Sequence, residues 1–507
     1  MKTVKRLAAV MGLIVFLTAC GAVTGQQETA DVVEIQLGDG AITVDGTPAG
    51  TDRERAVYIG NDIIYYEADK DFTYGEGTKE DAYSAESAAE HTVVHIAQPG
   101  TYSISGTLRK GQIAVDLGED SEDDPNAVVT LILNGADITC EVAPAVIFYR
   151  VYECGSSDDA SWNVDTSSAG ANVVIADGTT NTVNGSYVAR IYKPESVVLN
   201  EAGTEVEDAG KLHKYDGAFY SRMSMNMGGG RKNTGVLTIN AENEGLDSEL
   251  HLTVNGGIIR INAGNDGINT NEDGVSVTTV NGGELHIRVT DETGEGDGID
   301  SNGWLVINGG VVTAQACSFS ADAGIDSDMG IHINGGTVIA SGSMLDRIED
   351  GGQTYAVFSF AEKQSAAEPV YLKDRKGNAV MAFSPQNDYS VLVYSSPALK
   401  TDTYSLWSGD VQLSGQSGGG MEMPGMPPVM PEGMEPPEGM EPPVGMERPD
   451  DMTPPENMTP PDRMKLPQGN NPPDKPNGQP ESEPQELERE FRITDGGNLF
   501  RGIMPPG

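Results

Sequence analysis

The sequence predicts an all-β fold, a right-handed parallel β-helix, followed by a disordered tail rich in Pro, Met and Gly. Three observations predict it. The tripeptide Asn-Gly-Gly recurs at near-constant spacing, apolar and polar residues alternate after each copy, and glycine supplies 63 of the 507 residues. With only 6% aromatic residues, this composition is poor for a helical globule. It suits short strands separated by glycine-containing turns.

The Asn-Gly-Gly repeat sets the length of one coil. Its copies begin at Asn255, Asn281, Asn308 and Asn334, at intervals of 26, 27 and 26 residues. A period of this size is the signature of a solenoid. Such a period accommodates three short strands and their turns, whereas a β-propeller blade needs roughly 40 residues. The glycines permit a positive φ at the corner, and the Asn side chains can form a ladder between coils.

The residues after each Asn-Gly-Gly alternate with the period of a β-strand. Apolar residues stand four and six places after the Asn, as Ile259 and Ile261 do in the first copy, with Arg260 between them. Period-two alternation indicates a strand with one buried face, so equivalent strands of successive coils stack in parallel. Residues 32–230 lack the repeat but keep the same turn chemistry, and we expect them to continue the helix.

The N-terminus has the features of a targeting segment. Lys2, Lys5 and Arg6 precede an apolar stretch, residues 7–18, that is too short to span a bilayer. The sequence Leu-Thr-Ala-Cys that ends at Cys20 resembles a bacterial lipoprotein cleavage box. This resemblance implies a lipid on Cys20 that anchors the mature protein to the extracellular face of the cell membrane. The alternative is an ordinary secretory signal with an unmodified cysteine.

Composition divides the rest of the chain. Residues 21–31 form a short tether, and residues 32–413 have the composition of one folded β domain, with the clearest repeats at 233–342. Residues 414–507 form a low-complexity tail in which repeated prolines block helix and sheet. We interpret the tail as a spacer or a partner-binding segment. A copper(I) site made of its Met thioethers is the alternative, and residues 491–503 could be a docking peptide.

The net charge of −45, from 32 basic and 77 acidic residues, excludes nucleic acid as a partner. Most of the scattered carboxylates serve solubility. Besides Cys20 the chain has Cys140, Cys154 and Cys317, which lack the spacing of a zinc site. A Cys140–Cys154 disulfide is possible in an oxidising exterior.

A second motif places oxygen-bearing side chains at corresponding positions of successive coils. A Gly, an apolar residue, an Asp or Asn, and a Ser or Thr follow one another from Gly245, Gly267, Gly298 and Gly324. Coils stack about 4.8 Å apart, so facing carboxylates repel each other by about 1–4 kcal/mol. A hard cation with oxygen ligands, Ca²⁺, reverses the sign of that interaction. The alternative is that each Asp only forms a solvent-facing turn.

The run of residues 266–274, the following Asn281-Gly-Gly and the run of residues 296–303 resemble the carbohydrate-binding lipoproteins of clostridia and their relatives. That family has a calcium-binding parallel β-helix similar to family 9 pectate lyases, and attaches to cellulose and pectic polysaccharide. The resemblance covers residues 32–413. It implies these calcium ligands: Asp247, Asp266, Asn269, Asp297, Asp300, Asp322 and Asp326, then Asn271, Asp273, Asn302 and Asp328.

We expect a polysaccharide binder that is not an enzyme and is a monomer. A pectate lyase needs a basic residue beside its calcium, and residues 233–362 contain no Lys. Arg260 and Arg288 are predicted to face outward as sugar contacts, and a lyase that uses one of them as its base is the first alternative. Trp304 is either a sugar-stacking platform or an apolar cap on one coil. The second alternative is a structural adhesin stabilised by calcium.

Overall fold

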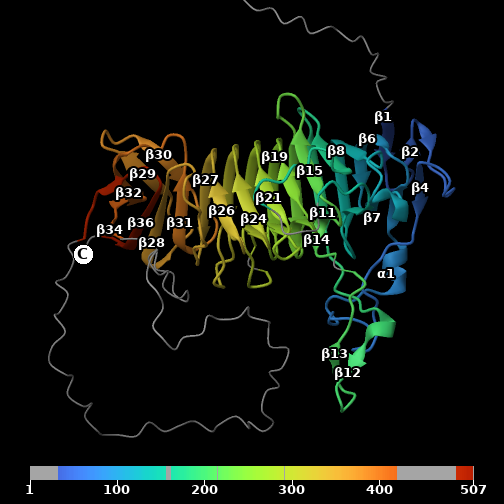
Figure 1. The fold of residues 1–507 in the computed structure, drawn as a ribbon. Helices are drawn as coiled ribbons and strands as arrows, with labels where there is room; N and C mark the ends of the chain where they lie inside the picture. The colour runs from blue at the N-terminus through green and yellow to red at the C-terminus, as the bar shows by residue number, and fades with distance from the viewer. Residues whose placement is uncertain (1–31, 156–160, 214, 291, 419–486, 506–507) are drawn as a thin grey trace, which may run out of the picture.

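The structure is a computed structural model that describes residues 32–155, 161–213, 215–290, 292–418 and 487–505 (Figure 1). The predicted signal peptide with Cys20, the tether at 21–31 and most of the predicted tail lie outside these residues. Nearly all of the described chain is strand, turn or loop, and its α-helix is the single turn α1 (Ala85–Ala89). No helix in the described part of the chain is long and apolar enough to cross a membrane.

Most strands stack in parallel on three faces of an elongated solenoid, as in a β-helix (Figure 1). We name the faces by their order in one coil. The first face consists of β10 (Ala171–Ile175), β15 (Met225–Gly229), β18 (Leu252–Val254), β21 (Val277–Val280), β24 (Trp304–Ile307) and β26 (Gly330–Ile333). The second face consists of β11 (Thr180–Gly185), β16 (Val236–Ala241), β19 (Ile258–Ala263), β22 (Glu284–Val289), β25 (Val311–Gln315) and β27 (Thr337–Gly342).

The third face is a separate sheet. It consists of β4 (Val57–Gly60), β5 (Thr92–Ile96), β7 (Gly111–Asp116), β9 (Val146–Arg150), β14 (Gly217–Ser221), β17 (Glu244–Ser248), β20 (Ile268–Thr270) and β23 (Ile299–Ser301). From β5 to β23 all its pairings are parallel. A regular coil therefore contributes one strand to each face.

The predicted alternation is confirmed by burial. Ile259, Leu285, Val312 and Val338 are at most 1% exposed and point into the solenoid. Arg260, between two such positions, is exposed on the second face. Each buried aliphatic side chain contributes roughly 1.5–3 kcal/mol, so the stacked apolar rows stabilise the coil.

The Asn-Gly-Gly corners join the first face to the second. The second glycine of each corner has a φ between 80° and 88°, a backbone conformation that residues with a side chain rarely adopt. A Cβ on Gly283 would lie 2.7 Å from the carbonyl oxygen of Gly257 in the preceding coil. The Asn side chains form the predicted ladder: Nδ2 donates to Oδ1 of the preceding coil at 3.0, 2.9 and 2.8 Å, from Asn281 to Asn255, Asn308 to Asn281, and Asn334 to Asn308.

Parallel pairing also extends to the N-terminal part of the chain. β1 (Val32–Leu37) pairs with β6 (Gly100–Leu108), which pairs with β8 (Val129–Cys140). β8 is long enough to pair with both β10 and β11. Residues 32–230 thus continue the solenoid. Two excursions project from it near α1 and the hairpin of β12 (Val198–Leu199) and β13 (Val206–Asp208) (Figure 1).

The C-terminal part of the described chain differs from the sequence prediction of a parallel helix up to residue 413 and a tail from 414 to 507. The parallel stacking of coils ends at β27, which pairs antiparallel with β31 (Tyr389–Ser395). An end unit follows, built from residues 355–417 and 487–505. Its other strands are β28 (Tyr355–Gln364), β29 (Val370–Asp374), β30 (Ala379–Phe383), β32 (Asp402–Ser408), β33 (Val411–Gln412), β34 (Ser414–Ser417), β35 (Phe491–Ile493) and β36 (Gly497–Met504).

The end unit exists for a physical reason. The last coil of a solenoid presents an open strand edge and an apolar interior, and both must be covered. β31 covers the edge of β27, while Phe491 and Phe500 pack on Phe358 at ring distances of 5.8 and 5.3 Å. Residues 487–505 are therefore part of the fold. The Pro-rich composition before them obscures this short apolar pattern in the sequence.

The cysteines are not bridged. Cys140 and Cys317 are buried, Cys154 is half-buried, and all three are free thiols. The possible Cys140–Cys154 disulfide is not formed in this structure.

Candidate metal centre and adjoining cleft

The third face carries the polar row that the sequence predicts. Asp247 in β17, Asn269 in β20 and Asp300 in β23 are register partners in three successive coils. Adjacent strands lie about 4.8 Å apart. Asp247 is fully buried and Asn269 is 7% exposed. The oxygens of this row are thus held close together with little water around them.

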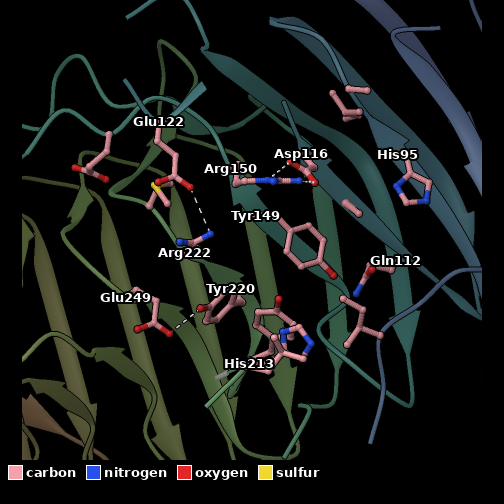
Figure 2. Close-up of a pocket in the computed structure, with 18 of the residues that line it drawn as sticks. His95, Gln112, Asp116, Glu122, Tyr149, Arg150, His213, Tyr220, Arg222 and Glu249 are labelled. Atoms are coloured by element: carbon pink, nitrogen blue, oxygen red, sulfur yellow. Dashed lines mark hydrogen bonds and ion pairs between the residues drawn. The ribbon is translucent and has the colours of Figure 1, made fainter. Parts of the chain in front are cut away.

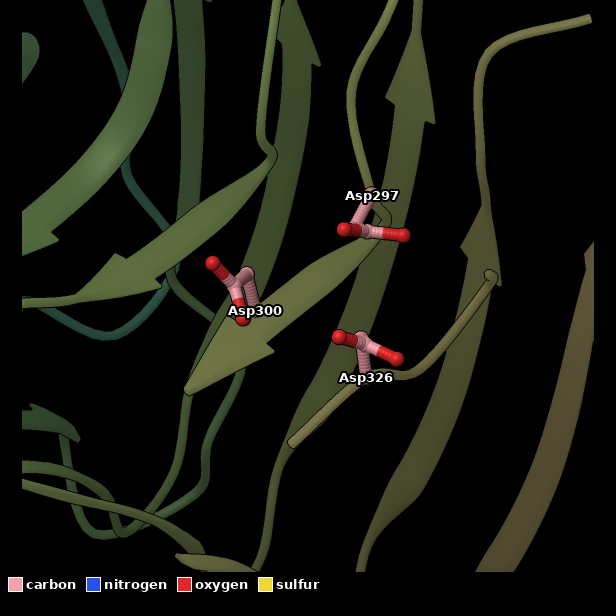
Figure 3. A group of neighbouring side chains, drawn as sticks. All are labelled: Asp297, Asp300 and Asp326. Carbon is pink, nitrogen blue, oxygen red and sulfur yellow. The ribbon is translucent and has the colours of Figure 1, made fainter. Parts of the chain in front are cut away.

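Three carboxylates, Asp300 at the end of this row and two others, converge there. Asp297 lies just before β23 and Asp300 lies within it. Asp326 lies in the next coil, where its N–H donates to the carbonyl of Ile299 at 2.7 Å. One oxygen from each carboxylate lies within 4.8 Å of the others (Figure 3). We call these three residues the carboxylate group. All three belong to the ligand set that the sequence predicts.

Electrostatics make the carboxylate group costly without a cation. Burial, followed by the neighbouring Asp266 and Asp326, raises the pKa of Asp297 to about 9. Burial, followed by the charges of Asp346 and Asp300, raises the pKa of Asp326 to about 7. Like charges in a partly buried site hold protons at neutral pH, and a divalent cation would displace those protons.

One buried amide oxygen also favours a cation. Asn269 donates from Nδ2 to Glu244 Oε1 at 3.0 Å. Among the described residues, no hydrogen-bond donor reaches its buried Oδ1. A buried acceptor left in this way costs about 1–3 kcal/mol. Carboxylate and amide oxygens are the ligands of a hard cation such as Ca²⁺, so the residues at this site fit a calcium ion.

Other predicted ligands fix the loops that carry the carboxylate group. Asp266 accepts the N–H of Asp297 at 2.7 Å, Asp297 accepts that of Ala323 at 2.5 Å, and Asp322 accepts that of Gly296 at 2.6 Å. Burial, followed by the nearby Asp322, raises the pKa of Asp266 to about 7. Asp266 and Asp322 therefore border the group and order its backbone.

The remaining predicted ligands lie at the far end of the same strands. Asn271 donates to Asp247, and Asn302 donates from Nδ2 to Asp273 Oδ1 at 3.0 Å. Asp273 and Asp328 are exposed. The structure does not bring these four turn residues, Asn271, Asp273, Asn302 and Asp328, into the carboxylate group.

Asp346 borders the site without being among the predicted ligands. It accepts the N–H of Ser327 at 3.1 Å, and burial raises its pKa. Its charge in turn raises the pKa of Asp326. Asp346 lies after β27, outside the repeated motif, so no periodic signal points to it.

An aromatic cleft of about 1080 Å³ adjoins the row on the third face (Figure 2). Tyr220 in β14 is the register partner of Asp247, so the cleft begins where the acidic row begins. Tyr215 lies edge-on to Tyr149 and Tyr220, at ring distances of 5.6 and 5.1 Å. Burial raises the pKa of Tyr220 and of Tyr215, so their hydroxyls remain protonated at neutral pH. We call this space the tyrosine cleft.

The charged residues of the tyrosine cleft include two arginine–carboxylate pairs. Arg150 donates to both oxygens of Asp116, at 2.7 Å from Nε and 2.6 Å from Nη2. Arg222 lies 3.4 Å from Glu122 across the rim (Figure 2). The sequence does not predict this cleft, because its residues come from non-repeating strands and from the excursion before β14.

The three predicted sugar contacts lie elsewhere. Arg260 in β19 is exposed, and Arg288 in β22 donates from Nε to Asn387 Oδ1 at 2.9 Å. Both are on the second face, whereas the carboxylate group is on the third. Trp304 begins β24 on the first face, half-buried, with its ring 5.2 Å from that of His332.

Comparisons with known proteins give one family match. A family model described as "carbohydrate-binding domain-containing protein" matches residues 90–356, more than half of the chain. No curated protein matches the sequence. Among solved structures, the chain is similar to a polysaccharide lyase-like protein from C. thermocellum, solved as a gadolinium derivative. The identity is 18%, the match covers 62% of this chain and 91% of that chain, and the TM-score is 0.34.

Proposed function

The chain belongs to the family of carbohydrate-binding domain-containing proteins, and on this basis we propose that it is a non-catalytic, calcium-dependent polysaccharide binder. Its right-handed β-helix is displayed on the cell surface by a lipid on Cys20. The observation that carries the proposal is the convergence of Asp297, Asp300 and Asp326 on the third face.

Calcium has two roles in this proposal. It neutralises the carboxylate group, whose raised pKa values reflect burial and repulsion. It also bridges the protein to a uronic acid, because a chain with a net charge of −45 otherwise repels an anionic glycan. Pectic polysaccharide is therefore the favoured ligand class.

The third face gives an elongated ligand two contacts. The row Tyr220, Asp247, Asn269 and Asp300 spans successive coils, so the tyrosine cleft and the carboxylate group are about three coil steps, roughly 14 Å, apart. Tyr58 and Tyr149, the half-buried tyrosines that line the cleft, offer part of their ring faces to sugar rings. Arg222, half-exposed at the rim, is placed to contact a sugar carboxylate.

The positions of Arg260 and Arg288 support binding rather than cleavage. A lyase base must reach the proton it removes, next to the metal-bound carboxylate. Both arginines are on a different face from the carboxylate group, and Arg288 is engaged by Asn387. In this proposal they have no role in catalysis.

The test uses residues 21–507 and polygalacturonate in calcium or in EGTA, with absorbance read for unsaturated products. We expect retention in calcium, loss of retention in EGTA, and no product. The double variant D297N/D326N should lose retention, whereas D410N, at an exposed position of the end unit, should keep it. Product formation would identify a lyase instead. Absence of both retention and product would favour a structural adhesin.

A further inference from the structure

A groove of about 760 Å³ lies on the first face, which the proposed calcium site does not use. Its floor is one register row of outward side chains, made of Asn172, Asn226, Thr253, Thr279 and Val306. One wall is the exposed Asn ladder, and the other is the segment 162–167. We call this space the ladder groove.

The wall segment is fixed at one end by the floor. Thr166 Oγ1 is hydrogen-bonded to Asn226 Oδ1 at 2.8 Å and to Thr253 Oγ1 at 2.7 Å. In return Asn226 donates from Nδ2 to the carbonyl of Thr166 at 2.7 Å. The groove is thus built by specific contacts between the segment and the coil surface.

At the other end of the wall, aromatic rings gather. The ring of His332 lies close to those of Trp162 and Trp304, at 4.7 and 5.2 Å. Trp162 is 44% exposed, a large apolar surface left open to solvent at the mouth of the groove. An exposed indole supported by neighbouring rings is a rigid platform for the apolar face of a sugar ring.

The ladder supplies donors and acceptors at each coil. An Asn amide has two N–H groups and two oxygen lone pairs. The ladder bonds of Asn281 and Asn308 use one N–H and one lone pair of each. Both side chains are exposed, so the second N–H and the second lone pair can bond a ligand. Sugar hydroxyls both donate and accept hydrogen bonds. A polysaccharide presents them at each sugar unit, and the ladder presents an Asn amide at each coil, about every 4.8 Å.

The charge of the groove selects against anionic glycans. Asp165 is the one charged residue among those that line it in the described chain. A uronate there would meet no cation and one like charge. This contrasts with the third face, where carboxylates and arginines dominate.

We infer that the ladder groove is a second glycan site, which takes an uncharged polysaccharide chain and does not use calcium. The inference rests on the carbohydrate-binding function proposed above but on none of the metal ligands. Trp162 stacks on a sugar ring, and the Asn ladder bonds the hydroxyls of the following units. The protein would then hold two classes of glycan on two faces.

The experiment titrates residues 21–507 with cellohexaose, an uncharged hexasaccharide, by isothermal titration calorimetry in calcium and in EGTA. Far-UV circular dichroism verifies that the fold persists in EGTA. The variants are W162A, the ring-preserving W162F and, as a matched control in the end unit, W407A.

We expect the same affinity in calcium and EGTA, a loss of about tenfold or more in W162A, partial rescue in W162F, and no loss in W407A. D297N/D326N should bind cellohexaose as the wild type does, and hexagalacturonate should not compete. Unchanged affinity in W162A, or binding that needs calcium while the fold is intact, would overturn the inference. Because cellohexaose and polygalacturonate are assayed separately, loss of binding to one does not decide whether the other binds.

Discussion

Replacing Asp297 by Asn should stabilise the protein in chelator and reduce the further stabilisation that calcium gives. Without a cation, burial and the acidic neighbours raise the pKa of the Asp297 carboxyl from 3.8 to about 9. A group with a raised folded-state pKa binds more protons when folded than when unfolded. The free energy of unfolding therefore falls as pH rises above 3.8 and stops falling above about 9.

The magnitude at pH 7 follows from the interval over which the proton is retained. From 3.8 to 7 is 3.2 pH units, and at about 1.36 kcal/mol per unit the cost is about 4 kcal/mol. Asn is neutral, has a similar shape and keeps an oxygen for the N–H of Ala323. We expect D297N to recover between about 1 and 4 kcal/mol at pH 7, and nothing at about pH 3.5.

Calcium opposes this gain. A bound ion stabilises the folded state in proportion to the logarithm of its concentration over Kd. Loss of one carboxylate ligand should raise the calcium Kd by about tenfold or more. In millimolar calcium, the variant therefore gains less stability than the wild type.

The assay is urea denaturation at about pH 3.5, 5 and 7, in EGTA and in calcium, with D410N as the matched exposed substitution. D410N should follow the wild type in all conditions. If D297N is destabilised in EGTA at pH 7, or if its effect does not change with pH or calcium, then the carboxylate group is not an unfavourable cluster that a cation relieves.

Three further predictions concern the fold. N308A breaks two ladder bonds and should lower the free energy of unfolding by about 1–3 kcal/mol; a urea midpoint equal to that of the wild type would contradict this. G283A places a methyl group 2.7 Å from a backbone oxygen at a φ of 85°, so we expect a loss of about 1–3 kcal/mol. The matched control, measured in the same way, is G50A, at a glycine with open space around it and no positive φ. Truncation after residue 486 removes Phe491 and Phe500 from the end unit and should expose its apolar core, detected as dye binding that the full chain lacks.

The periodic part of the fold could be predicted because a solenoid repeats the same local problem in each coil. Every copy of Asn-Gly-Gly must turn the same corner, so the positive φ of Gly283 and the ladder bond of Asn281 follow from one motif. The same logic places Asp297, Asp300 and Asp326 near one another, since corresponding positions in adjacent coils are spatial neighbours.

What could not be predicted lies where the repeat stops. Asp346 reaches the acidic region from outside the motif, and the tyrosine cleft joins β9, β14 and an excursion that no period relates. Trp162 has no spacing that links it to His332, which lies in another coil far along the chain. Such contacts depend on how loops fold back over the coils, which a single sequence does not encode in a local pattern.

The pairing of β34 with β36 has a consequence for the chain between them. Gly415 and Glu488 are bridge partners, so the described chain on either side of residues 419–486 is held together at one place. Loop closure entropy grows only with the logarithm of length, and insertions or deletions within this segment should therefore leave the fold intact. A protease that cuts once inside it would produce two fragments that still migrate as one particle under native conditions, with residues 487–505 held by their neighbours rather than by the peptide chain.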